Sequence, residues 1–175
     1  MDRRWVFLSF ISILSLVGII IWCLKSHPGA SYYGEQFILD EWRFMPFVQF
    51  KPITLIVYLG FLAWAFFLEG VEDWFRSANE DLLKFVMITS ALTSFGSLYE
   101  LFFNFSLWGA LMVVTDVVNP DALVNKFPTA ETTVSLVYAS KLVLLIFATS
   151  TYTLYFISKI SKSKWKDKDA NRLES

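Results

Sequence analysis

The sequence predicts an all-α, polytopic integral membrane protein with four membrane-spanning helices. Apolar residues make up 55% of the 175-residue chain and stand in long continuous blocks. In a soluble domain they would instead recur with the period of a helix or a strand. Four of the blocks approach the roughly 20 residues that cross a bilayer core. The length fits one domain, so we expect a single membrane domain over residues 1–175, folded as a four-helix bundle.

The first block, residues 5–24, contains no charged residue and follows Arg3 and Arg4. A cleaved signal peptide has an apolar region of only about 7–15 residues, followed by a cleavage site of small residues. The block is longer than that, and residues 27–30 read HPGA, which lacks the small-x-small pattern. We therefore predict an uncleaved first span.

The second span is predicted at residues 53–74. It follows Pro52, which suits the first turn of a helix because its missing N–H costs nothing there. The apolar run itself ends at Leu68, and we expect the helix to continue past Glu69 towards Trp74 at the membrane interface.

The third block, residues 85–118, is longer than one crossing requires. We place the span at 85–108 and interpret 109–118 as a helical extension or an interfacial segment. The fourth span is predicted at 133–157 and is rich in hydroxyl side chains. These either allow neighbouring helices to approach closely or bond to carbonyls of their own helix.

The placement of Lys and Arg predicts the orientation, because cytoplasmic segments beside spans carry an excess of them. Four spans put both termini on one side. That side carries ten cations, namely Arg3, Arg4, Arg76, Lys84, Lys159, Lys162, Lys164, Lys166, Lys168 and Arg172. The other side carries four, namely Lys25, Arg43, Lys51 and Lys126. We expect both termini in the cytoplasm, residues 159–175 as a basic cytoplasmic tail, and a plasma or cytoplasmic membrane.

Two charged residues stand inside predicted spans, where charges are rare and tend to be functional. Glu100 lies about 12 Å inward from Trp108, taken as an outer interface marker, and Lys141 lies about 12 Å inward from Thr133. These matched depths predict an intramembrane polar pair. The pair acts as a structural link between helices or as a polar site facing a cavity or partner; alternatively, one charge reaches the interface. Possible polar neighbours are Tyr99, Asn104, Tyr138 and Ser140.

An acidic interface cluster is predicted where the second span ends. Glu69 and Asp73 are four residues apart and share a helix face, as do Glu72 and Arg76. Two carboxylates could bind a cation. The alternative is a solvated helix end at the cytoplasmic interface.

The first outer loop contains apolar residues at helical spacing, which predicts a short amphipathic helix lying on the outer membrane surface. Trp, Met and Arg are also enriched at binding hot spots. The loop is therefore a possible partner-docking surface, formed by Ile38, Leu39, Trp42, Arg43 and Met45. Seating on lipid is the alternative role.

Several functional classes find no support in the composition. The chain has one cysteine, Cys23, and one histidine, His27, so an intramolecular disulfide and a His-based metal cluster are excluded. No nucleophile stands with a recognisable base. The net charge of −1 argues against a nucleic-acid partner. We expect no cofactor and no metal.

The leading functional hypothesis is a non-catalytic membrane interaction protein, an accessory subunit or binding module of a larger complex. Its expected partners are the lipid bilayer and other membrane subunits or further copies of the chain. The alternative is a small oligomeric transporter or channel that uses Glu100 and Lys141. A membrane enzyme that acts on a lipid or quinone through its carboxylates has the least support.

Overall fold

The computed structural model describes residues 2–30, 34–38, 42–45, 48–115 and 130–173. Most of this part of the chain is helical: α1 (Arg3–Ser26), η1 (Glu35–Phe37), α2 (Pro52–Gly70), α3 (Glu72–Ser77), α4 (Glu80–Thr115) and α6 (Ala130–Leu173). Two short strands, β1 (Trp42–Met45) and β2 (Val48–Phe50), form an antiparallel hairpin. Four helices are long and apolar enough to cross a membrane, in agreement with the sequence, over Arg3–Ser26, Pro52–Gly70, Glu80–Ala110 and Leu136–Lys164.

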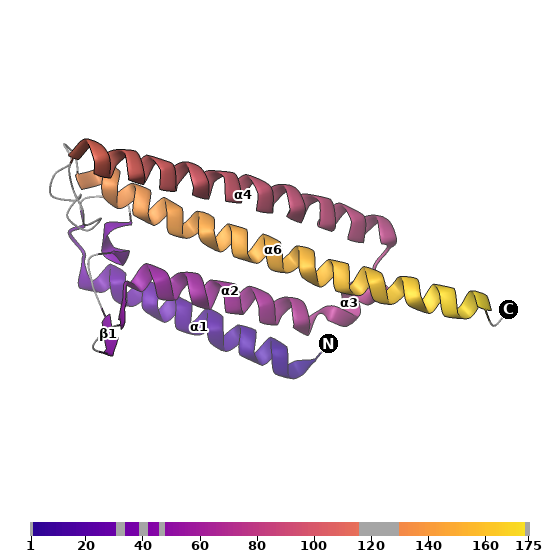
Figure 1. The fold of residues 1–175 in the computed structure, drawn as a ribbon. Coiled ribbons are helices and arrows are strands. Elements are labelled where there is room, and N and C mark those ends of the chain that lie inside the picture. Colours follow the sequence, from indigo (N-terminus) through magenta and orange to yellow (C-terminus); the bar gives the residue numbers. More distant parts are fainter. Residues whose placement is uncertain (1, 31–33, 39–41, 46–47, 116–129, 174–175) are drawn as a thin grey trace.

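The four long helices lie side by side in a row, in the order α1, α2, α6, α4 (Figure 1). α1 packs on α2, α2 on α6, and α6 on α4. The predicted bundle is therefore an open row, in which α1 and α4 occupy the edges. Large apolar side chains are exposed along both edge helices, among them Phe10, Leu14, Phe95 and Phe102. The row also has two broad faces, one on either side of the four helices.

The start of α1 and the end of α6 lie at the same end of the row, together with α3 (Figure 1). We call this the α3 end. The opposite end, which holds η1 and the β-hairpin, is called the hairpin end. Local signals explain the helix starts: the Asp2 carboxylate accepts a hydrogen bond from the Arg4 N–H at 3.0 Å, and Pro52 stands in the first turn of α2.

The second predicted span is interrupted. We expected one helix over residues 53–74, but α2 ends at Gly70 and α3 begins at Glu72. α1 lies very close at this point, because a Cβ on Gly70 would be 2.8 Å from Val6 Cγ2. The new helix starts with acidic Glu72 and Asp73 and has Arg76 in its last turn, which suits its dipole.

The third and fourth helices extend beyond their predicted spans of 85–108 and 133–157. α4 continues through Thr115, so residues 109–115 form a helical extension, while 116–118 lie outside the described residues. α6 has 44 residues, which corresponds to about 66 Å. It continues past its neighbours at the α3 end, so the basic tail is helical as far as Leu173 (Figure 1).

The prediction of an amphipathic helix in the first outer loop is wrong. Residues 35–37 form one turn of η1, and Trp42–Met45 is a strand that pairs with Val48–Phe50. The sequence contains the reason, because Trp42 and Phe44 alternate with Arg43, a period of two that favours a strand. Pro46 adds to this, since a residue that precedes proline is disfavoured in helical conformation.

A buried apolar cluster lies at the α3 end, where α2, α3, α4 and α6 meet. Its buried members are Leu68, Phe75, Leu83, Phe156, Ile157 and Ile160. Phe156 is fully buried and packs edge-to-face on Phe75, with ring centroids 5.6 Å apart. Through this cluster, the segment in which the chain reverses direction between α2 and α4 packs against the middle of α6.

Candidate functional site

The structure places Glu100 and Lys141 on opposite faces of the row. At 100° per residue, Glu100 lies on the same side of α4 as Thr93 and Thr89, which line a groove on one face. Lys141 lines a different groove, together with Leu144 and Ala148. No ion pair joins the two charges, and among the described residues neither has an oppositely charged partner. The predicted pair is therefore not formed within one chain.

Two of the four predicted polar neighbours, Tyr138 and Ser140, contact residues other than Glu100 and Lys141. Tyr99 is 68% exposed, and Asn104 is half-buried. Tyr138 stacks on Phe37 of η1, with ring centroids 5.9 Å apart. Ser140 donates to the carbonyl of Leu136 on its own helix at 2.7 Å.

Six of the ten residues that line the groove on Glu100's side of the row carry a hydroxyl, and we call it the hydroxyl groove. It has a volume of about 300 Å³ and lies over α6, between α2 and α4. Its lining residues are Trp64, Phe85, Val86, Thr89, Ser90, Thr93, Ile146, Thr149, Ser150 and Thr153. The sequence had indicated only the hydroxyls of the fourth span.

Hydroxyl groups also join the helices of the row. Trp64 Nε1 donates to Thr153 Oγ1 at 2.8 Å, which links α2 to α6, and Ser94 and Thr151 share a hydrogen bond of 2.8 Å between α4 and α6. Ser9 of α1 donates to the Ala63 carbonyl of α2 at 2.9 Å. Others bond only within their own helix, such as Thr149 to the Leu145 carbonyl. α6 therefore contains the predicted bonds to carbonyls of its own helix and, in addition, hydroxyls that bond to neighbouring helices.

The second groove, the lysine groove, lies between α2 and α6 on the other face of the row. It has a volume of about 270 Å³ and is lined by Thr54, Val57, Tyr58, Phe61, Lys141, Leu144 and Ala148. Thr54 stands in the first turn of α2, which places Lys141 nearer the hairpin end than the middle of the row. The half-buried lysine is the one charge among these lining residues, so the groove suits an anionic group.

The acidic cluster is a structural clasp between α2, α3 and α6. Lys159 Nζ lies 3.7 Å from Glu69 Oε2 and 3.8 Å from Glu72 Oε2, and Arg76 Nη2 lies 2.6 Å from Glu72 Oε1. The Tyr152 hydroxyl donates to Glu69 Oε1 at 2.8 Å. The Asp73 side chain is exposed. Such partly exposed pairs each contribute about 0–1 kcal/mol.

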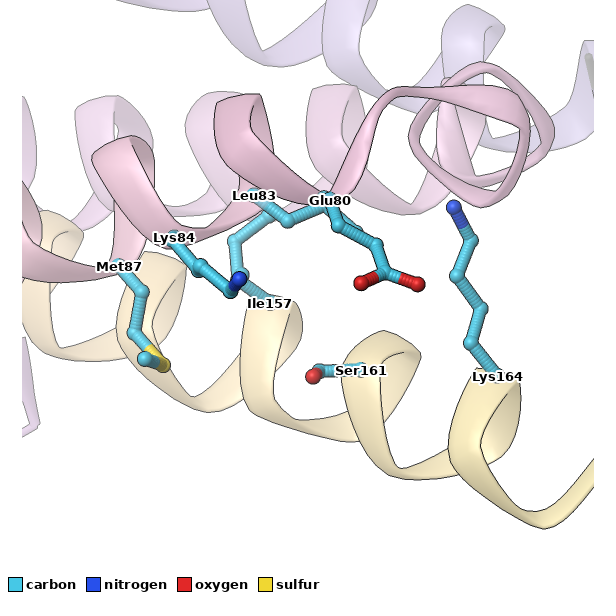
Figure 2. Close-up of a pocket in the computed structure, with 7 residues that line it drawn as sticks. All are labelled: Glu80, Leu83, Lys84, Met87, Ile157, Ser161 and Lys164. Carbon is cyan, nitrogen blue, oxygen red and sulfur yellow. The ribbon is translucent and has the colours of Figure 1, made fainter. Parts of the chain in front are cut away.

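A small cleft lined by both charged and apolar side chains lies beside this clasp, between the start of α4 and α6 (Figure 2). In the cleft, Glu80 of α4 faces Ser161 and Lys164 of α6 (Figure 2). Its volume of about 30 Å³ leaves room for a water but not for a substrate. Lys164 Nζ donates to the Ala78 carbonyl at 2.7 Å and so caps the end of α3. This arrangement is best explained as part of the clasp.

The proposed docking surface is only partly described. Ile38 follows η1 in a turn and is half-buried, whereas Leu39 lies outside the described residues. The backbone of Trp42, Arg43 and Met45 belongs to β1, and it lies at the hairpin end of the row (Figure 1). Docking by this loop stays a prediction.

Within the described residues, no three His, Cys, Asp or Glu side chains come together as a set of metal ligands. The chemistry that the site offers is therefore one isolated carboxylate and one isolated ammonium, on opposite faces, with hydroxyl groups beside the carboxylate. Comparison with known proteins gives no match to a protein family, to a curated protein or to a solved structure.

Proposed function

We propose that this chain crosses a membrane four times and acts as a non-catalytic interaction protein, a subunit or binding module of a larger membrane assembly. The four long apolar helices support the membrane location. The cation count supports a cytoplasmic position for the α3 end. The start of α1 and the end of α6 also lie at this end (Figure 1).

One observation carries the interaction role. Glu100 is exposed on edge helix α4, inside the Glu80–Ala110 span, and it has no counter-charge among the described residues. A charged side chain facing lipid tails costs about 2.5–3.5 kcal/mol even on the insertion scale that gives the lowest values. A polar or cationic group from another protein would remove that cost, whereas lipid tails cannot.

The test is the native mass of the protein after gentle detergent extraction, with mass spectrometry of the proteins that co-migrate. We expect a complex larger than one chain, weakened by Glu100→Gln. Asp81→Asn is the matched control, because Asp81 is an exposed acid at the start of the same helix. A lone monomer that cross-links to no protein in native membranes would overturn the proposal.

A second function, transport by an oligomer, is favoured by the hydroxyl groove. Six Thr and Ser side chains line it, and the stripe of Thr89 and Thr93 leads along α4 to Glu100. A cation could follow such a path if several copies enclosed it. Flux into reconstituted vesicles that is unchanged by Glu100→Gln or Lys141→Met would exclude a role for these residues in transport.

A further inference from the structure

We infer that the partner of α4 is a second copy of this chain, and that Glu100 of one copy pairs with Lys141 of the next. The inference rests on the proposed function, since it requires copies that share a membrane. Within one chain the two charges cannot meet, because they lie on opposite faces of the row. In a stack of identical rows, the Glu100 face of one copy lies against the Lys141 face of the next copy.

The faces follow from positions around α6. Ser150 lines the hydroxyl groove and Ala148 lines the lysine groove, and two residues correspond to a rotation of about 200° around a helix. Lys141 lies seven residues before Ala148, on the same side. Glu100 lies seven residues after Thr93, on the hydroxyl-groove side of α4. One face of each row therefore carries a carboxylate, and the other carries an ammonium.

The depths of the two charges agree closely enough for a contact. Ser94 of α4 and Thr151 of α6 are level, because their hydroxyls are 2.8 Å apart. The helices are antiparallel, so Glu100 is level with Leu145. Lys141 lies four residues further towards the hairpin end, about 6 Å away in depth. Two long side chains can bridge this offset, and copies in one membrane share the same orientation.

The arrangement must be head-to-tail. A two-fold symmetric dimer pairs one surface with itself, which would set Glu100 against Glu100 or Lys141 against Lys141. A head-to-tail contact pairs the unlike charges at every interface and continues to a ring or an array. Each copy then uses both of its unpaired charges.

The shapes of the two surfaces also fit. Gly96 lies one turn from Glu100, and a Cβ placed there would meet no atom within 4 Å, so another helix can approach closely. The lysine groove has an open apolar surface beside Lys141, to which Tyr58, Phe61 and Leu144 contribute. We therefore place α4 of one copy over the lysine groove of the next.

The test is charge exchange between two differently tagged copies, co-expressed and co-purified in mild detergent. Glu100→Lys alone and Lys141→Glu alone should each reduce recovery of the second tag by about tenfold or more, because like charges then face each other. A mixture of the two single variants should restore recovery, since every mixed interface again joins a Lys to a Glu. The Glu100→Lys, Lys141→Glu double variant should restore it too.

Rescue by mixing also separates this interface from misfolding, because two misfolded variants would not recover together. Lys162→Glu is the control, a charge reversal on an exposed α6 residue far from both grooves, and it should leave recovery unchanged. Failure of both rescues while wild-type copies still co-purify would overturn the inference. If wild-type copies fail to co-purify but other proteins do, the inference is overturned and the proposed function stands. Recovery of a single chain with neither a second copy nor any other protein would overturn both the inference and the proposed function.

Discussion

At the α3 end, four helices meet around Phe156, and charged side chains join α2 and α3 to α6. At the hairpin end, within the described part of the chain, the single turn of η1 packs on both α1 and α6. Phe37 stacks there on Tyr138, and Gly34 approaches the same ring. The comparison shows that buried apolar side chains from four helices come together at the α3 end, whereas among the described residues the hairpin end attaches η1 to α6 through Phe37, Gly34 and Tyr138.

Removing buried volume at the α3 end should have the largest effect. Phe156→Ala is expected to lower the free energy of unfolding by about 3–5 kcal/mol, because it leaves a cavity beside Phe75. Tyr155→Ala is the control, since this neighbour is 63% exposed, and it should cost under about 1 kcal/mol. Denaturant titration in mild detergent measures both values. Equal losses would mean that the α3 end is not the stabilising core.

A change at the hairpin end should have an intermediate effect. Gly34 has a φ of +85°, and a Cβ there would lie 2.5 Å from Tyr138 Cγ. Gly34→Ala combines backbone strain with this clash, so we expect a loss of about 1–3 kcal/mol in the free energy of unfolding. Gly29→Ala introduces neither problem, because no atom lies within 4 Å of its added Cβ. Thermal unfolding of the two variants side by side gives the comparison, and an unchanged Gly34→Ala protein would contradict the contact.

A hydrogen bond between the two ends should have the smallest effect. Thr153→Val removes the acceptor of Trp64 Nε1, which joins α2 to α6. Bonds of this kind between membrane helices contribute about 0.6 kcal/mol on average and at most about 1.7. Thr149→Val is the control, because the Thr149 hydroxyl bonds only within α6. The difference between the two variants in one titration reports the interhelical bond, and a larger loss for Thr149→Val would argue against it.

Sequence patterns located the helices well because long apolar runs can be read locally. The four blocks that begin near residues 5, 53, 85 and 133 lie within long helices as far as the structure describes them. Prediction from the local sequence failed where one segment contained patterns typical of two different structures. In the first outer loop, helical spacing from Ile38 to Met45 competed with the alternation around Arg43, and the strand period won. At Gly70, the close approach of α1 coincides with the break that the second apolar block did not reveal.

The candidate site shows the same division. The sequence by itself determined that Glu100 and Lys141 stand inside long apolar helices that could cross a membrane, because position along a helix follows from counting residues. Only the tertiary structure decided that they face away from each other, because the angle at which a side chain leaves its helix has meaning only once the neighbouring helices are placed. The order α1, α2, α6, α4 places α6 between α2 and α4, and so the two charges open onto separate faces.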